Sequence, residues 1–403
     1  MSNDIATAQN QKEITNIWQL DPKVTFLNHG SFGACPRAIA IRQNELRREL
    51  EAEPVNFMAR RVPDLLDASR ARVAQLVGAR SKQIAFVTNA TSAVNAVLRS
   101  LEFGPGDEIL TTDHVYGGCR NAVEFIADRT GAKVVYAHIP FPIDDPSQAT
   151  EAILAAVTPN TKLALIDHIT SPTALVLPIA EIVSRLREKG VETLVDGAHA
   201  PGMVDLQLDK IGAAFYTGNC HKWLCTPKGA AFLHVREDFL SRIHALTVSF
   251  GYTADPSIRS RYLQEFDWPG TMDFTPWLCV GDAIEYLDTL LPGGLAAISA
   301  RNHKLALEAQ TMICGALQQK PACPDSMIGT MAAFCLPDMP GLPPSSHPAI
   351  DALSDLLRKE HGIVVPVNTC MAVSGRILRI SVQLYNNLDH YLHLGDVLIT
   401  LIR

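Results

Sequence analysis

Between about residue 80 and residue 235, short apolar runs alternate with amphipathic helical patterns. The helical patterns are clearest after Ser92 and between Pro178 and Lys189, where apolar residues recur every three or four positions. Strands that alternate with helices predict a mostly parallel α/β sheet with helices on both faces. The seven strand-like runs are Ile84–Thr88, Glu108–Thr112, Lys133–His138, Lys162–Asp167, Thr193–Asp196, Ala213–Thr217 and Ala230–Val235. The last two runs are close in sequence, which predicts a locally antiparallel element.

After residue 250 the pattern changes and indicates a second, smaller α+β domain. Residues 250–276 contain several glycines and prolines and are expected to form a loop. The elements expected next are a long helix over Leu295–Leu317, a Pro-rich connection over Leu336–Pro348, a helix over Ala349–His361, and strands over Ile363–Val367 and Ile377–Val382. We therefore predict an N-terminal tail and active-site segment at 1–40, a large α/β domain at 41–280 and a small α+β domain at 281–403.

Composition narrows the class of protein. The 403 residues are 47% hydrophobic and carry a formal net charge of −7, which gives no reason to expect nucleic acid or an anionic membrane as a partner. The first dozen residues are polar, so we expect a loose tail and no secretion signal. The nine cysteines lack metal-type spacing, which favours reduced thiols in a cytoplasmic protein without a metal site.

Two charged residues of the large domain follow strand-like runs. Asp196 ends one run, and in open α/β sheets ligands bind beyond the carboxyl ends of strands. Lys222 lies in a segment poor in other charges, whereas surface lysines usually have solvated neighbours. Taken alone, Asp196 could cap a helix and Lys222 could be a partly buried ion-pair partner. Together with the features below, they favour a binding site.

The segment Asn89-Ala90-Thr91-Ser92 lies between a strand-like run and a helical pattern. Backbone amides at a helix N-terminus, with the hydroxyls of Thr91 and Ser92, can bind an anion such as phosphate. The same residues would equally serve as a plain helix cap.

The segments DGAHAPG (196–202) and GNCHKW (218–223) resemble the cofactor-binding signature of fold-type-I pyridoxal 5'-phosphate (PLP) enzymes of the class V aminotransferase superfamily. Within it, the chain is most similar to the isopenicillin N epimerase family. Further matches occur along nearly the whole chain, in LNHGSFGACP, AEPVNFMAR, TNATSAVN, GDEILTTDHVY, PGTMDFTPWL and RILRISVQLYN. The resemblance implies PLP as the cofactor, an amino-acid substrate, and a homodimer with shared active sites.

The resemblance also implies roles around the cofactor ring. Lys222 would supply the amine for a Schiff base, and Asp196 would keep the ring nitrogen protonated so that the ring can accept electrons. His199 would lie against the phenolic oxygen; alternatively it satisfies a nearby backbone group. The stacking position falls on Tyr116, although His114 would also serve.

For the phosphate, the resemblance adds Asn219 and His221 to Ala90, Thr91 and Ser92. The family more often has serine at the position of Asn219, so that contact is a weaker expectation. Gly270 and Thr271 resemble the loop that reaches the phosphate from the neighbouring subunit.

The substrate carboxylate calls for a planar, bidentate donor, which favours arginine. Arg379 occupies the superfamily's position for that arginine and is the only charge inside a strand-like run. A strand arginine that faces solvent is the alternative interpretation. Asn28 and His29 belong to a segment that resembles the stretch across the mouth of the active site, and are expected as substrate contacts.

Several reactions are open to such a site. Lys222 can take the Cα proton, and return of a proton to the opposite face, by Tyr116 or by a water, gives epimerisation. The same site could support transamination or elimination. Cys370 would be the nucleophile of a cysteine desulfurase, although its spacing to Arg379 is shorter than expected for that group. A non-catalytic α/β binding protein is disfavoured, because both Lys222 and Asp196 are kept and no dinucleotide or P-loop motif is present.

Overall fold

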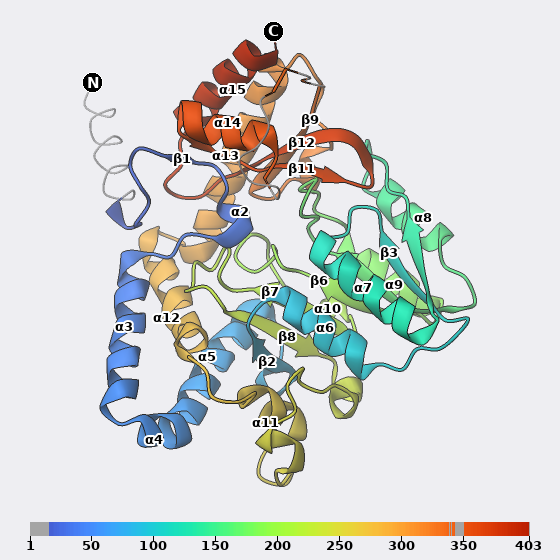
Figure 1. The fold of residues 1–403 in the computed structure, drawn as a ribbon, viewed down its shortest axis with the longest axis vertical. Helices are drawn as coiled ribbons and strands as arrows, with labels where there is room; N and C mark the ends of the chain where they lie inside the picture. Colours follow the sequence, from blue (N-terminus) through green and yellow to red (C-terminus); the bar gives the residue numbers. More distant parts are fainter. Residues whose placement is uncertain (1–15, 338, 340, 343–349, 403) are drawn as a thin grey trace.

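A computed structural model describes residues 16–337, 339, 341–342 and 350–402, and shows an α/β fold with a large sheet and a smaller sheet (Figure 1). Three predicted segments fall wholly or partly outside the described residues. They are the loose tail over the first dozen residues, most of the Pro-rich connection, and the start of the helix expected at Ala349. The large sheet has seven strands in the order β2-β8-β7-β6-β5-β3-β4. These are β2 (Ile84–Val87), β8 (Ala231–Val235), β7 (Phe215–Asn219), β6 (Glu192–Asp196), β5 (Thr161–Asp167), β3 (Glu108–Thr112) and β4 (Lys133–Ala137). The predicted fold class is confirmed.

All neighbouring strands from β7 to β4 run parallel, and β8 runs antiparallel to both β7 and β2. The predicted antiparallel element is therefore confirmed. The carboxyl ends of β5, β6 and β7 meet at one edge of the sheet, at Asp167, Asp196 and Asn219. This edge carries the candidate site.

Alternating strand residues pack on opposite faces of the large sheet, as the twofold period of a strand requires. Ile84 and Phe86 belong to one core cluster, whereas Ala85 and Val87 belong to the other. The first cluster also includes residues of α5 (Val62–Val77), α8 (Ser147–Ala155), α9 (Ile179–Glu188) and α12 (Thr275–Leu290). The second includes residues of α6 (Ala90–Ser100), α7 (Gly117–Thr130) and α11 (Arg261–Asp267). Helices thus cover both faces, as predicted.

The loop expected at 250–276 was predicted incorrectly in part, because it contains α11 and the start of α12. Ser260 caps α11 by accepting a hydrogen bond from the backbone N–H of Leu263. Tyr262 and Phe266 are buried in the second core cluster, so tertiary packing stabilises a helix too short for a clear periodic signal. The remaining helical segments before β9 are α2 (His29–Phe32), α3 (Arg37–Ala52), α4 (Pro54–Asn56), a π-helical turn (Phe57–Arg61), α10 (Leu208–Ile211), α13 (Gly294–Ala316) and 3₁₀ turns at Ser81–Gln83, Glu237–Arg242, Phe250–Thr253 and Asp325–Met327.

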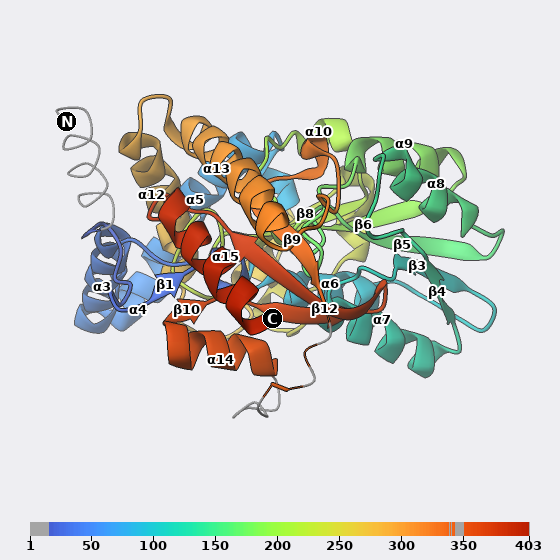
Figure 2. The same cartoon turned by 90° about the horizontal axis from the view of Figure 1, so that it is seen from above.

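The smaller sheet has three antiparallel strands in the order β11-β12-β9. They are β11 (Val367–Cys370), β12 (Val373–Ser381) and β9 (Met331–Leu336), packed with α13, α14 (Ala352–His361) and α15 (Leu388–Ile402) (Figure 2). The single strand expected at Ile363–Val367 is wrong. It is divided at Pro366, which has no N–H for a ladder, and β10 (Ile363–Val364) pairs instead with β1 (Thr25–Phe26).

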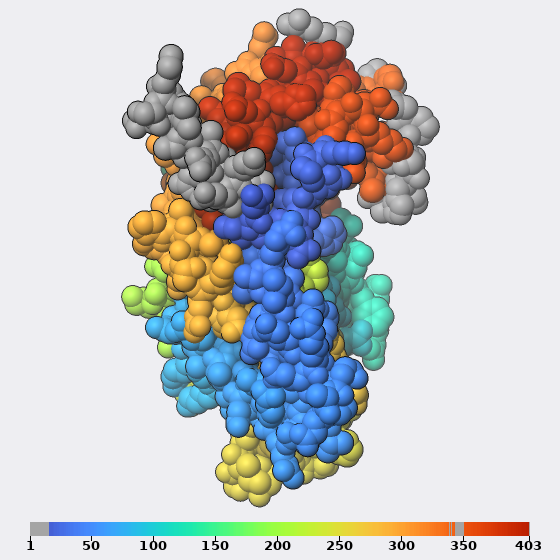
Figure 3. All heavy atoms as spheres, turned by 90° about the vertical axis from the view of Figure 1, so that its left-hand side faces the viewer, coloured from blue at the N-terminus to red at the C-terminus, as the bar shows by residue number. Residues whose placement is uncertain are grey.

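The N-terminal segment runs along one flank of the molecule and contacts the C-terminal part at its upper end (Figure 3). Pairing of β1 with β10 makes this contact, and the N–H of Ser381 donates to the carbonyl of Leu27 at 2.9 Å. Helix α12 runs across residue 280, where the sequence analysis placed a domain boundary, and the boundaries themselves stay a prediction. In the described part of the chain, no helix has both the length and the apolarity to cross a membrane.

Candidate active site

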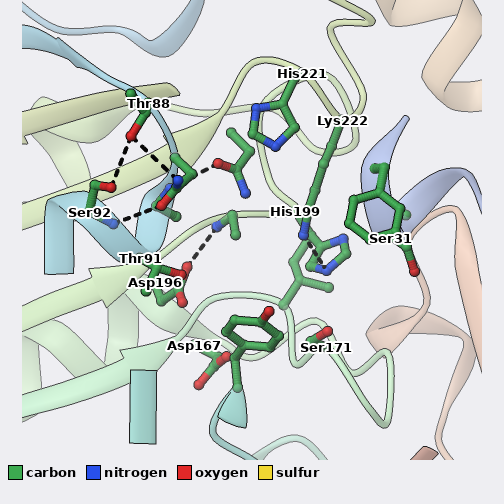
Figure 4. Close-up of a pocket in the computed structure, with 18 of the residues that line it drawn as sticks. Ser31, Thr88, Thr91, Ser92, Asp167, Ser171, Asp196, His199, His221 and Lys222 are labelled. Atoms are coloured by element: carbon green, nitrogen blue, oxygen red, sulfur yellow. Dashed lines mark hydrogen bonds between the residues drawn. The ribbon is translucent and has the colours of Figure 1, made fainter. Parts of the chain in front are cut away.

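A cavity of about 680 Å³ lies beyond the carboxyl ends of β5, β6 and β7 (Figure 4). Short segments distant in sequence line it, because the parallel strands and the helix starts all deliver their loops to the same edge. From the sheet domain the lining includes Thr88, Ala90, Thr91, Ser92, Tyr116, Asp167, Ser171, Asp196, His199, Asn219, His221 and Lys222. Ser31, Phe32, Asn368 and Arg379 come from the two ends of the chain.

Lys222 reaches the cavity from the turn that follows β7. Its Nζ lies 3.0 Å from Nε2 of His199. Burial, and next the positive charge of Arg379, lower the pKa of the Lys222 ammonium from its usual 10.5 to about 7, against the opposing effect of Asp196. A large fraction of this amine is therefore unprotonated at neutral pH, which is the state that can attack a carbonyl carbon.

His199 follows β6 and is buried. Burial and the charges of Lys222 and Arg379 hold the pKa of its imidazole well below the usual value. The indole N–H of Trp223 donates to Nδ1 of His199 at 3.5 Å, so the ring is neutral and fixed beside Lys222.

Asp196 ends β6, with both carboxylate oxygens hydrogen-bonded. Oδ1 accepts the backbone N–H of Ala198 at 3.0 Å, and Oδ2 accepts the thiol of Cys119 at 3.0 Å. These two donors orient a buried carboxylate toward the cavity. Cys119 lies on α7 and was not predicted as part of the site.

Asp167 is a second buried carboxyl that the sequence analysis missed. It ends β5 and is in register with Asp196 on the adjacent parallel strand, so both side chains lie on the same side of the sheet. Burial, and then the charge of Asp196, raise the pKa of Asp167 well above its usual range. Its Oδ2 has no hydrogen-bond partner among the described residues.

The start of α6 faces the cavity with several polar groups. Asn89 caps the helix by accepting the N–H of Ser92 at 2.8 Å, and the N–H of Ala90 donates to Oδ1 of Asn219 at 2.9 Å. The hydroxyl of Ser92 lies 2.9 Å from that of Thr88, which was not predicted. The structure thus places Ala90, Thr91, Ser92, Asn219 and His221 around one end of the cavity, where a helix N-terminus suits an anion.

Arg379 is buried in β12, so the solvent-facing alternative is wrong. Its Nη1 donates to the carbonyl and hydroxyl of Ser171 at 2.7 and 3.2 Å, and Nη2 donates to Ser31 and Asn28 at 3.1 and 3.3 Å. Its Nε is buried without a partner among the described residues. Burial lowers the pKa of the guanidinium to about 10, which leaves it charged at neutral pH.

The structure separates Tyr116 from His114. Tyr116 stands at the start of α7, is 46% exposed and lines the cavity, and burial of its phenol raises its pKa. His114 is fully buried, with its ring nitrogens 2.7 Å from the Thr173 hydroxyl and 2.9 Å from the Ile139 carbonyl. Of these two residues, Tyr116 lines the cavity and could contact a ligand there, whereas His114 does not line it.

Four predicted residues do not line the cavity of the single chain. Asn28 contacts Arg379, and His29 is buried, with Nδ1 2.8 Å from the hydroxyl of Tyr385 and Nε2 3.0 Å from the carbonyl of Lys222. Both contact residues of the cavity, and their role as substrate contacts stays a prediction. Gly270 and Thr271 lie in the loop before α12, away from the lining, and their contact with a neighbouring subunit stays a prediction.

The site residues fit PLP. The amine of Lys222 could react with the aldehyde of PLP, and the buried carboxylate of Asp196 could pair with its cationic ring nitrogen. The N-terminus of α6 could bind the phosphate. The buried, unpartnered atoms Asp167 Oδ2 and Arg379 Nε also indicate that the cavity is built for a polar ligand. Among the described residues, no group of His, Cys, Asp and Glu is arranged as a metal site.

The fold and the site define a PLP-dependent enzyme of fold type I. The chain belongs to the class V aminotransferase family, whose model matches residues 39–335, and its cofactor is PLP.

Known proteins resemble nearly the whole chain. It is 35% identical to the isopenicillin N epimerase of Streptomyces clavuligerus, over 94% of this chain and 95% of that protein. It is 30% identical to a probable chloroplastic L-cysteine desulfhydrase of Arabidopsis thaliana, over 95% of this chain and 84% of that protein. The solved apo structure of a cysteine desulfurase from Thermococcus onnurineus NA1 has the same fold, with a TM-score of 0.79 and 21% identity over 97% of this chain and 98% of that one.

Proposed function

We propose that this enzyme inverts the configuration at the α-carbon of an amino acid or an amino-acid-containing compound, in the manner of an isopenicillin N epimerase. The observation that carries the proposal is the pairing, in one cavity, of an amine with a depressed pKa at Lys222 and a second proton-bearing group at Tyr116. Inversion needs one group to remove the Cα proton and another to return a proton to the opposite face. Similarity to the Streptomyces enzyme over 94% of the chain supports the same reaction.

Arg379 is proposed to hold the substrate carboxylate. Nη2 is held only at 3.1 and 3.3 Å by Ser31 and Asn28, and Nε is buried without a partner among the described residues. A substrate carboxylate that displaced the groups around them would meet two parallel N–H donors. A bidentate pair of this kind fixes the orientation of the Cα–H bond as well as binding the substrate. Burial of Arg379 strengthens the interaction because water competes less for the guanidinium.

PLP, when bound, withdraws electrons from Cα and so makes its proton acidic. Lys222 is proposed both to hold the cofactor's aldehyde carbon and, once released, to accept the Cα proton at Nζ. His199, neutral and 3.0 Å away, cannot compete as a cation and keeps that amine directed into the cavity. The Tyr116 hydroxyl is proposed to donate the returning proton.

The remaining predicted contacts stay proposals for cofactor binding. Asp196 would pair with the ring nitrogen, His199 would lie against the phenolic oxygen, and the start of α6 with Asn219 and His221 would hold the phosphate. Gly270 and Thr271 would complete the phosphate site from a second copy of the chain. Phe32, which lines the cavity and is 71% exposed, leaves a surface that such a partner subunit would cover.

Elimination at a carbon–sulfur bond is the second candidate, and the similarity to the Arabidopsis desulfhydrase favours it. It would use the same proton removal by Lys222, followed by loss of a β-thiol. A desulfurase mechanism has less support, because Cys370 lies in β11 and does not line the cavity.

The deciding experiment incubates the PLP-loaded enzyme with a panel of L-amino acids and cysteine conjugates in deuterated water. Epimerisation predicts deuterium at Cα together with loss of optical purity. Release of sulfide, ammonia and pyruvate would instead establish elimination, and keto-acid formation without turnover would establish half-transamination. Cys370→Ala is the matched variant, and we expect its rates to stay within about twofold of the parent enzyme, as for a residue outside the site.

A further inference from the structure

Two carboxyl groups, and not one, lie side by side in the lining of the cavity. Asp167 and Asp196 end adjacent parallel strands in register, are 2% and 3% exposed, and both line the cavity. Cα atoms of such register partners lie about 4.8 Å apart, which brings two carboxyls on the same side of the sheet within strong electrostatic reach.

The two carboxyls differ in their hydrogen bonds. Both oxygens of Asp196 accept donors, from Ala198 and Cys119, which suits a carboxylate. Asp167 has a donor for one oxygen, in the backbone of Tyr116, but its buried Oδ2 has no partner among the described residues. A buried carboxylate oxygen without a donor is costly, whereas a protonated carboxyl carries no negative charge that needs one.

The charges that face Asp167 are of mixed sign. Asp196 on β6 opposes its ionisation, and the ammonium of Lys222 and the backbone N–H of Tyr116 favour it. The thiol of Cys119 on α7 stays neutral, because burial and Asp196 raise its pKa well above the usual value. Burial and the adjacent carboxylate dominate.

We propose that Asp167 and Asp196 act as one carboxyl pair that carries a single negative charge, with Asp196 as the carboxylate and Asp167 as its protonated partner and a positioning residue. When Asp196 is neutral or absent, Asp167 loses its proton and takes over part of the interaction with the ring nitrogen. The proposal concerns the cofactor alone, so it holds for epimerisation and elimination alike, and each can fail without the other.

A double-mutant cycle tests the pair. Asp167→Asn, Asp196→Asn and the double variant would be compared with the parent enzyme for PLP dissociation constant and for the pH titration of the bound cofactor's visible absorption. We expect Asp167→Asn alone to move the titration midpoint by less than about 0.3 units, because an amide resembles a neutral acid and Asp196 keeps its charge.

In the Asp196→Asn variant, the added Asp167→Asn substitution should have a larger effect on PLP binding than it has in the parent enzyme. There it removes the remaining carboxylate, and we expect it to weaken PLP binding at least about 10-fold further, which is the non-additivity that defines a coupled pair. Equal effects of Asp167→Asn in both backgrounds would overturn the proposal. So would a midpoint shift of about one unit or more from Asp167→Asn alone, since that would show a charged Asp167.

Two further measurements separate this role from a structural one. Thr193→Val, on β6, removes another buried and unpartnered oxygen outside the cavity, and should leave PLP affinity and the absorption titration unchanged. Infrared spectra of the parent apoprotein at neutral pH should contain a carboxylic-acid C=O band that disappears in Asp167→Asn. Absence of that band from the parent protein would also overturn the proposal, whether or not the doubly substituted chain folds.

Discussion

The ε-amine of Lys222 and Nε2 of His199 lie 3.0 Å apart in the lining of the cavity. Two ordinary basic groups at this distance would share a proton or repel each other, but here burial lowers the pKa of both. The pair therefore holds a reactive amine near neutral pH, although the charges of Asp196 and Asp167 favour its protonated form. The chemistry of Lys222 depends on this neutral neighbour as much as on its own position.

Replacement of Lys222 by alanine should remove the covalent attachment of PLP and the proton acceptor together. We expect activity to fall by at least about 10³-fold, because the loss of an acid–base group alone costs about 10²–10⁴-fold and the covalent attachment is lost as well. Borohydride treatment of the parent enzyme, followed by peptide mass spectrometry, should find the reduced cofactor on Lys222. Lys228→Ala, at an exposed position nearby, is the control and should keep both the adduct and the activity.

The rate at which the apoprotein captures PLP should rise with pH to a plateau, with a midpoint near pH 7. The amine attacks only when unprotonated, and burial together with Arg379 lowers the pKa of Lys222 to about 7. Arg379→Gln removes a positive charge, so the pKa of Lys222 should rise and the midpoint should move to higher pH. A parent midpoint near the usual lysine value would contradict this assignment. Arg376→Gln, at a residue that pairs with Asp351 away from the cavity, should leave the profile unchanged.

Arg379→Lys should weaken the use of substrates that have an α-carboxylate. A lysine offers no planar pair of donors, and loss of one charge-assisted hydrogen bond costs about 1.5–3 kcal/mol, equivalent to a decrease of about 10-fold or more in kcat/KM. Steady-state kinetics should show most of the loss in KM. Equal loss for an amine that lacks the carboxylate would show that Arg379 acts elsewhere.

Gly33→Ala should destabilise the protein and loosen PLP. Gly33 has a φ of 70°, and a Cβ there would lie 2.1 Å from the carbonyl oxygen of His221, the residue before Lys222. Thermal unfolding should show a loss above about 1 kcal/mol, the cost of an incompatible backbone. Gly106→Ala is the control, because it has a φ of 94° and no atom within 4 Å of the added Cβ. It should share the backbone cost and keep PLP affinity; a matching loss of affinity would refute the steric argument.

The sequence was sufficient to predict the strands of the large sheet, because they are short apolar runs separated by segments with clear helical periodicity. Helical periodicity was weak in α11, because that short helix is stabilised by packing against the core and not by its own sequence pattern. The apolar run Ile363–Val367 predicts one continuous strand, but Pro366 divides it between β10 and β11.

The parts of the site that sequence missed are those created by register and by long-range approach. Asp167 ends a strand just as Asp196 does, but only the pairing of β5 with β6 shows that the two carboxyls are neighbours. The contact of Ser171 with Arg379 joins residues 208 positions apart, and no local pattern encodes it. In the sequence, Cys119 is indistinguishable from an ordinary apolar residue on the buried face of an amphipathic helix, so its contact with Asp196 could not be predicted.

The hydrogen bonds of His29, to the carbonyl of Lys222 and to the hydroxyl of Tyr385, have a consequence for how the enzyme is made. At roughly 5–20 residues per second, a ribosome adds Tyr385 some 10–30 s after it adds Lys222. During that interval the lysine loop lacks the support that His29 receives from the C-terminal end, and Arg379 has not yet been added to lower its pKa. We therefore expect nascent chains to capture cofactor only after synthesis is nearly complete, so that a truncated chain emerges colourless.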